Sequence, residues 1–212
     1  FKDKFISDCE TLIDVIHGRK YILNNDYYSN GFYNKDISKW TIGYILGVEW
    51  EDVTVAYTDN KNSNDSYTGK YISAKESASS FMTMLAEVGD RTIEYESSKY
   101  GEQRLLAFSN WPTTDPFDYN EKITKHFRKC AKVDVEQLIF SKEFVGGTFA
   151  SYHVYPYYPD YLNYDENKVN YVDSKGNINT YYTYLKRLTD YHTIPVVISE
   201  FGVSTGRGMA QK

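Results

Sequence analysis

Four short apolar segments, spaced along the chain and each followed by polar or aromatic residues, constrain its fold most. They are WTIGYILGVEW (40–50), RLLAFSNW (104–111), GGTFASYHVYPYYP (146–159) and PVVIS (195–199). Short apolar runs without strict alternation are typical of strands that are buried on both faces of a parallel sheet. The sequence therefore predicts an α/β fold in which helices cover parallel strands.

Apolar residues recur at helical spacing before and between these segments. Residues 1–16 carry such a pattern, and Gly18 is predicted to end the helix. A second helical pattern runs from about 74 to 100, and a third precedes the last strand. Residues 58–70 have no periodicity and are predicted to form a polar loop, whereas the charged stretch up to Phe144 indicates helix and loop.

Composition narrows the class of protein. With 212 residues, 41% of them hydrophobic and 25% charged, the chain has the size and composition of one globular domain. Its net charge of −5, without a cluster of basic residues, argues against a nucleic-acid partner. It has no apolar run of the roughly 20 residues that cross a bilayer. Cys9 and Cys130 lack metal-ligand or redox spacing, so each is predicted to be a buried free thiol.

The residues at the predicted carboxyl ends of the strands are the candidate functional groups. Parallel α/β barrels place their functional residues at these ends. A dinucleotide-binding fold would require a GxGxxG motif after a strand, and the chain has none. It also lacks an HExxH motif and a phosphate loop, so we expect no cofactor and no catalytic metal. The four ends carry Glu49-Trp50, Asn110-Trp111, His153 with Tyr155, and Glu200-Phe201.

The segments GYILGVEW, SNWPTTDP, SYHVYPYYP and PVVISEFG resemble, in this order, the motifs of strands 4 to 7 in the retaining glycoside hydrolases of clan A. The resemblance covers roughly residues 40–208. It implies a partial (β/α)8 TIM barrel, with residues 1–212 forming a single-domain fragment from helix 3 through strand 7. About half of the barrel would then be present. TTDP and YHVYPYYPD suggest a less characterised bacterial branch of larger multidomain proteins.

The resemblance also implies roles for individual residues in a double-displacement mechanism. Glu49 matches the acid/base and Glu200 the nucleophile, two carboxyl groups that retaining enzymes hold about 5–5.5 Å apart. Trp50 is expected to desolvate Glu49, and Tyr155 to donate a hydrogen bond to Glu200. The expected contacts to a sugar substrate come from Trp50, Asn110, Trp111, His153, Tyr155 and Arg207. Asp115 is expected to cap a following helix.

One departure from the family motif leaves the activity open. Val48 stands where the family usually has an asparagine that holds the sugar 2-hydroxyl, and Asn110 is a candidate to replace that contact. The chain is thus predicted to act as a glycoside hydrolase or transglycosylase on a polysaccharide or cell-surface glycan. The alternatives are a non-catalytic carbohydrate-binding barrel and a half-barrel that only mediates assembly.

The family resemblance and the number of strands also imply the expected partners. They are a carbohydrate substrate and the remainder of the barrel in a longer chain, because four strands without closure leave two unpaired edges that can associate. The chain begins on Phe1 and resembles an excised piece, with an extracytoplasmic or membrane-tethered bacterial location favoured.

Overall fold

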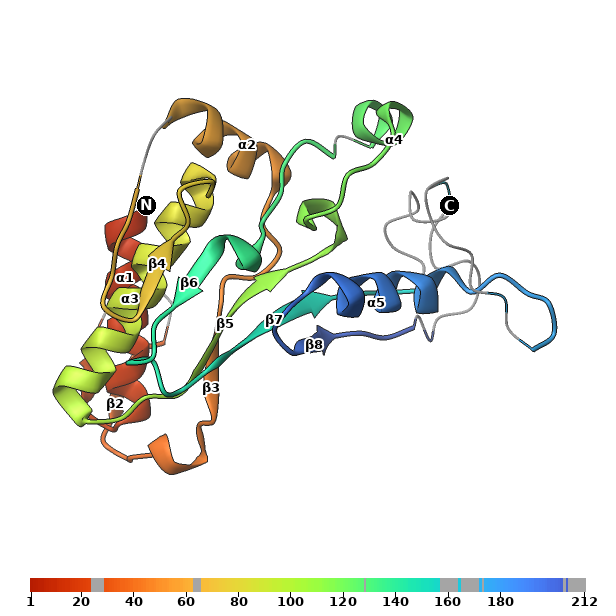
Figure 1. The fold of residues 1–212 in the computed structure, drawn as a ribbon. Coiled ribbons are helices and arrows are strands. Elements are labelled where there is room, and N and C mark those ends of the chain that lie inside the picture. Colours follow the sequence, from red (N-terminus) through yellow and green to blue (C-terminus); the bar gives the residue numbers. More distant parts are fainter. Residues whose placement is uncertain are drawn as a thin grey trace.

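The computed structural model describes residues 1–23, 29–62, 66–127, 129–156, 164, 172, 174–203 and 205. Its centre is a four-stranded parallel sheet in the order β3-β5-β7-β8 (Figure 1). The order in the sheet follows the order in the chain, so the predicted α/β fold with parallel strands is confirmed. The strands are β3 (Gly43–Leu46), β5 (Leu105–Asn110), β7 (Thr148–His153) and β8 (Val196–Glu200).

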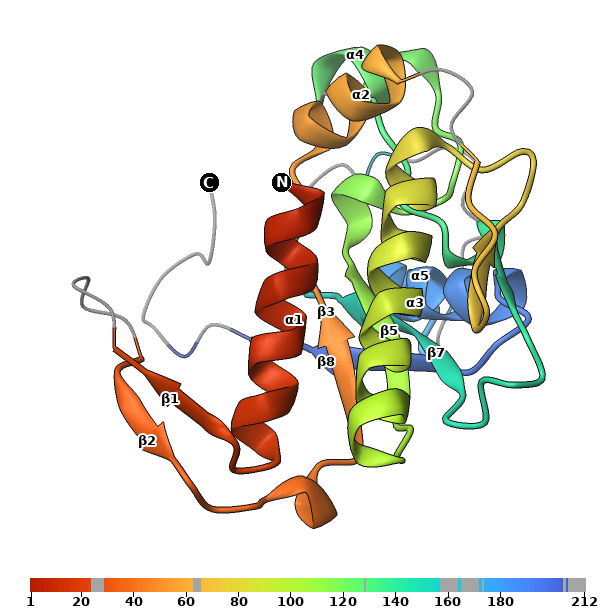
Figure 2. The same cartoon turned by 90° about the vertical axis from the view of Figure 1, so that its left-hand side faces the viewer.

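Helices connect these strands and accompany them. α1 and α3 lie side by side, while α5 runs beside β7 and β8 (Figures 1 and 2). Two small antiparallel pairs, β1 with β2 and β4 with β6, lie outside the main sheet. The bounds are α1 (Lys2–Ile16), β1 (Lys20–Ile22), β2 (Gly31–Tyr33), η1 (Ser38–Trp40), α2 (Asp52–Lys61), β4 (Ile72–Ala74), α3 (Ser80–Tyr100), η2 (Pro112–Thr114), α4 (Glu121–His126), η3 (Val135–Gln137), β6 (Leu138–Phe140) and α5 (Thr180–Tyr191).

Residues with known preferences for helix ends mark where α1 ends and where α3 and α5 begin. Gly18 has φ +65°, a left-handed conformation that favours glycine, and it ends α1 as predicted. Ser79 caps α3 by accepting a hydrogen bond from the Met82 amide at 3.3 Å. Asn179 caps α5 by accepting from the Tyr182 amide at 2.9 Å. None of the described helices is long and apolar enough to cross a membrane.

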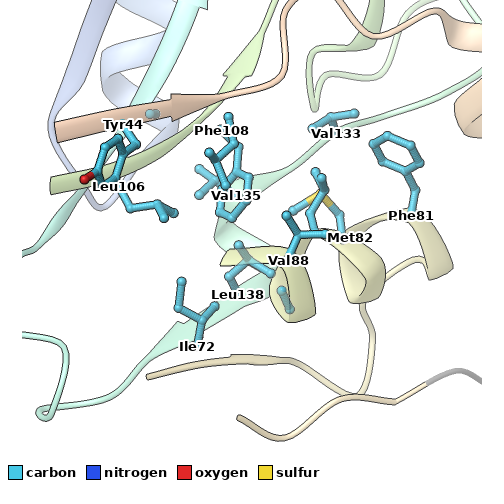
Figure 3. Packing of buried hydrophobic residues seen from close by; sticks show 14 of the residues in the cluster. Tyr44, Ile72, Phe81, Met82, Val88, Leu106, Phe108, Val133, Val135 and Leu138 are labelled. Atoms are coloured by element: carbon cyan, nitrogen blue, oxygen red, sulfur yellow. The ribbon is translucent and has the colours of Figure 1, made fainter. Parts of the chain in front are cut away.

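The core lies between the sheet and α3. Leu106 and Phe108 of β5 point toward α3, where Gly89 allows the helix to approach: a Cβ atom at that position would lie 2.8 Å from the Phe108 ring. Figure 3 shows both side chains in one cluster with Val88 and Met82 of this helix. Because successive side chains of a strand point to opposite faces, even-numbered β5 residues are committed to this core.

The opposite face of the sheet is more open. Ile45 of β3 and Val197 and Ser199 of β8 stay exposed there. Within the described part of the chain, β3 and β8 each pair along one edge only. The described sheet is therefore open, and it does not by itself show the expected barrel.

Several local expectations need correction. Residues 52–61 form α2, although 58–70 was predicted as a loop; among the α2 residues only Val55 is buried, so no apolar periodicity marks the helix. The polar segment after α1 contains the β1–β2 hairpin, which the sequence analysis did not predict. Cys9 is buried as expected, but Cys130 is exposed.

A buried ion cluster joins the amino-terminal ends of β3 and β5 to the helices. The fully buried Glu96 carboxylate of α3 accepts hydrogen bonds at one oxygen from Arg104, from Tyr44 (2.8 Å) and from His17, whose Nε2 lies 2.9 Å away. The His17 ring stacks on Tyr100 with centroids 3.7 Å apart. Burial, and secondarily the positive charge of Arg104, lower the pKa of His17.

This depressed pKa predicts a loss of stability on acidification. Between the folded-state pKa of His17 and its unfolded value of about 6.5, the unfolded chain binds more protons, so the free energy of unfolding decreases as the pH falls through that window. Urea denaturation at several pH values between about 7 and 5 measures this dependence. We expect His17→Gln to flatten it and His126→Gln, at an exposed histidine, to leave it unchanged. An equal slope in parent and His17→Gln would contradict the assignment.

The open edges predict self-association of the isolated chain. Ile42 is exposed immediately before the edge strand β3, and a lysine near a strand edge opposes edge-to-edge pairing. We expect light scattering to show oligomers of the parent chain and a shift toward monomer for Ile42→Lys. Val145→Lys, at another exposed apolar residue outside the four strands of the main sheet, is the matched control. A parent chain that is a compact, stable monomer would contradict this prediction.

Candidate active site

Glu49, His153 and Glu200 meet at the carboxyl end of the parallel sheet. Glu49 lies three residues beyond the end of β3, whereas His153 and Glu200 are the last residues of β7 and β8. One ligand atom from each side chain lies within 4.8 Å of the others. The two glutamates that the sequence assigned to separate strand ends are thus brought together, each with a partly exposed side chain (37% for Glu49 and 49% for Glu200).

The imidazole of His153 bridges the two carboxylates. Its Nδ1 lies 3.2 Å from Glu49 Oε1 and 3.1 Å from Glu200 Oε2. Its Nε2 lies 3.4 Å from the Ser109 hydroxyl of β5. A shift in the β7–β8 register at Tyr152/His153 places His153 opposite Glu200. In its protonated form the ring would offset part of the repulsion between the two carboxylates.

Tyr155 supports Glu200 from the other side. Its hydroxyl donates a hydrogen bond to Glu200 Oε1, which confirms the contact expected from the sequence. This hydrogen bond raises the pKa of the Tyr155 phenol, since ionisation would place a second negative charge beside the carboxylate. Glu200 therefore has a partner at each oxygen, Tyr155 at Oε1 and His153 at Oε2. These two contacts fix the orientation of the Glu200 carboxylate.

The indole N–H groups of Trp50 and Trp111 both donate to backbone carbonyls. The Trp50 indole N–H donates to the Ser109 carbonyl at 2.7 Å, and the Trp111 indole N–H donates to the Trp50 carbonyl at 2.9 Å. The Trp50 ring packs edge-on against Phe81, with centroids 5.2 Å apart. The structure thus gives each indole a role in holding the strand ends. Desolvation of Glu49 by Trp50 and sugar stacking by Trp111 stay predictions.

Asn110 is turned toward the core. Its Nδ2 donates to the Val133 carbonyl at 2.6 Å and to the Tyr152 hydroxyl at 3.4 Å. Its Oδ1 accepts from the Trp111 amide and from the Thr114 hydroxyl, both at 2.8 Å. Because the side chain is buried and its amide is engaged, the geometry does not support Asn110 as a replacement for the missing 2-hydroxyl contact. A direct substrate contact of this residue stays a prediction.

Three residues from the sequence analysis remain, Arg207, Val48 and Asp115. Arg207 lies outside the described residues. Val48 is 66% exposed beside Glu49, so an apolar side chain faces solvent at this strand end. Asp115 does not cap a helix as expected: its buried carboxylate forms an ion pair with Lys129 at 3.1 Å and accepts from the Tyr184 hydroxyl at 2.7 Å.

Sequence reasoning did not single out Ser109. This serine contacts His153 through its hydroxyl and Trp50 through its carbonyl. A polar residue inside the apolar run LLAFSN was the available signal.

The side chains of Glu49, His153 and Glu200 could also hold a cation. Two carboxylates and an imidazole are ordinary ligands for a divalent metal, and their ligand atoms are close enough to share one ion. The expected absence of a catalytic metal accordingly stays a prediction.

Comparisons with known proteins give no relative. No protein-family model matches the chain, and searches of curated proteins and of solved structures find no similar protein. The fold defines the chain as an α/β protein with a parallel sheet, and only the geometry of the site indicates a function.

The position of Asn110 predicts a structural effect of its removal. Asn110→Ala leaves the Val133 carbonyl, the Trp111 amide and the Thr114 hydroxyl without this partner, and we expect it to lower the free energy of unfolding by about 2 kcal/mol. Chemical denaturation measures this change. Asn60→Ala, at an exposed asparagine of α2, should change it by less than about 0.5 kcal/mol. Unchanged stability of Asn110→Ala would contradict the structural role.

Proposed function

We propose that this chain carries the catalytic carboxylates of a retaining glycoside hydrolase or transglycosylase that acts on a polysaccharide or cell-surface glycan. The observation that carries the proposal is the pairing of Glu49 and Glu200: one oxygen of each lies within 4.8 Å of the other at the carboxyl ends of parallel strands. Retaining enzymes hold their two carboxyl groups at about 5–5.5 Å, whereas inverting enzymes leave roughly 6.5–9.5 Å for a water molecule.

In this proposal Glu200 attacks the anomeric carbon while Glu49 gives its proton to the departing glycosidic oxygen. The C–O bond to the leaving group breaks as the ester bond to Glu200 forms, which yields a covalent glycosyl-enzyme. Glu49, now ionised, then takes a proton from water or from an acceptor hydroxyl. That oxygen attacks the anomeric carbon and releases Glu200. Tyr155 and His153 hold Glu200 in position for both steps.

The proposal extends to the architecture around the sheet. The open edges of β3 and β8 fit a (β/α)8 barrel whose other strands belong to a longer polypeptide. In such a barrel the partly exposed face of the sheet would become the lumen, and the glutamates would lie at its mouth. A carbohydrate is the corresponding partner, and an extracytoplasmic or membrane-tethered location in a bacterium suits an enzyme that acts on surface glycans.

A second candidate is a carbohydrate-binding barrel without turnover. The observation that favours it is Val48, an exposed side chain beside Glu49 that has no hydrogen-bonding group. A contact to the sugar 2-hydroxyl strengthens in the transition state, so its absence affects catalysis more than binding.

The first test replaces the nucleophile in the polypeptide that contains the whole barrel. We expect Glu200→Gln to lower kcat by several orders of magnitude on the glycan that a substrate screen identifies, because an amide cannot form the covalent intermediate. Glycan binding, measured by calorimetry, should persist. Glu51→Gln, at an exposed glutamate two residues from Glu49, is the matched control and should retain activity.

Two results separate the alternatives. Turnover by Glu200→Gln at the parent rate would overturn the assignment of the nucleophile. Glycan binding without turnover in the parent would favour the non-catalytic barrel.

A further inference from the structure

We infer that Trp50 and Trp111 are positioning residues, which fix the loop that carries Glu49 through two indole–carbonyl hydrogen bonds between the ends of β3 and β5. The inference rests on the proposed function of Glu49 as acid/base. We call this pair of bonds the indole clasp: Trp50 Nε1–H to the Ser109 carbonyl (2.7 Å) and Trp111 Nε1–H to the Trp50 carbonyl (2.9 Å).

Glu49 needs such support because it lies beyond the regular sheet. The β3–β5 pairing ends at Leu46 and Phe108, and Glu49 follows three residues later in a loop. Without ladder hydrogen bonds, a loop backbone can adopt several conformations, and an acid/base displaced by about 1 Å loses much of its catalytic effect. The clasp supplies cross-strand hydrogen bonds at the residue that directly follows Glu49.

The loop itself is shaped to place the Trp50 ring. Gly47 has φ +83°, and a Cβ atom there would lie 2.0 Å from the Trp50 ring, so the ring lies directly over this glycine. Phe81 packs edge-on against the ring at 5.2 Å, and Phe5 lies at 6.2 Å. These contacts restrict the ring, and therefore the direction of its N–H group.

Ser109 connects the clasp to the other side of the site. Its carbonyl accepts the Trp50 N–H, and its hydroxyl lies 3.4 Å from His153 Nε2. His153 Nδ1 in turn lies 3.2 Å from Glu49 Oε1. Ser109 thus contacts both Trp50, the residue next to Glu49, and His153, whose ring contacts the Glu49 carboxylate. Loss of one clasp bond is expected to change the Glu49–His153 contact.

Substitution by phenylalanine tests the clasp, because it removes the indole N–H and keeps an aromatic ring. In the polypeptide with the whole barrel, we expect Trp111→Phe to lower kcat about tenfold and to change KM by less than about twofold. The reason is that the variant loses one hydrogen bond that holds the acid/base in position for the transition state. A sugar-stacking role alone would leave kcat nearly unchanged, because phenylalanine keeps a ring that can stack on a sugar. Unchanged kcat would overturn the inference.

A second measurement needs no substrate. The three tryptophans of this chain contribute three indole signals to a ¹⁵N–¹H spectrum. Trp40 is 68% exposed and serves as the internal reference for rapid hydrogen exchange. We expect slow exchange at Trp50 and Trp111. Trp111→Phe should also shift the His153 ring signals in the direction that Glu49→Gln shifts them, whereas Trp40→Phe should not.

The readouts separate failure of the inference from failure of the proposed function. Slow exchange together with the His153 shift, in a protein without turnover, would uphold the clasp and reject the enzyme. If Trp111 exchanges as fast as Trp40, or if the His153 signals ignore Trp111→Phe, the inference is wrong even in an active enzyme. Should Trp111→Phe unfold, Trp50→Phe provides the same comparison, because it removes the other clasp bond.

Discussion

The buried carboxylate of Glu96 is the constraint on which the arrangement of the sheet depends. A carboxylate without compensation in this environment would cost several kcal/mol, so α3 can pack as it does only when its donors are in place. These donors come from the end of α1 (His17), from β3 (Tyr44) and from the residue before β5 (Arg104). The cluster therefore specifies how α1 and α3 lie against the first two strands. It also aligns those strands at the end opposite to the candidate site.

The two ends of the sheet use ionisable groups in different ways. At the amino end, the side chains of His17, Glu96 and Arg104 are at most 8% exposed. Their interactions can stabilise the fold, but a solute cannot reach them. At the carboxyl end, Glu49 and Glu200 share one imidazole and stay accessible. Accessibility weakens their contribution to stability and is what chemistry on an external molecule requires.

The residues of the candidate site could be predicted from the sequence better than the contacts that these residues make. That Glu49, His153 and Glu200 lie at strand ends is visible in the sequence, and the contact of Tyr155 with Glu200 was expected. The direction of Asn110 was not recognised. It follows from alternation along β5, where Asn110 falls on the same face as Leu106 and Phe108. The indole clasp joins a side chain to the backbone of another strand end, an interaction that leaves no residue pattern.

The sequence by itself determined the features that depend on neighbouring residues. Helical periodicity gave α1 and α3, Gly18 ended α1, and the short apolar runs located the four parallel strands. The sequence did not predict α2, because only one of its residues is buried and the helix therefore has no apolar periodicity. Tertiary structure alone decided that Glu49 and His153 meet across 104 positions of the chain, and that a register shift sets His153 opposite Glu200. Such contacts follow from strand pairing and core packing, which depend on the whole chain at once, whereas periodicity and helix ends depend on a few adjacent residues.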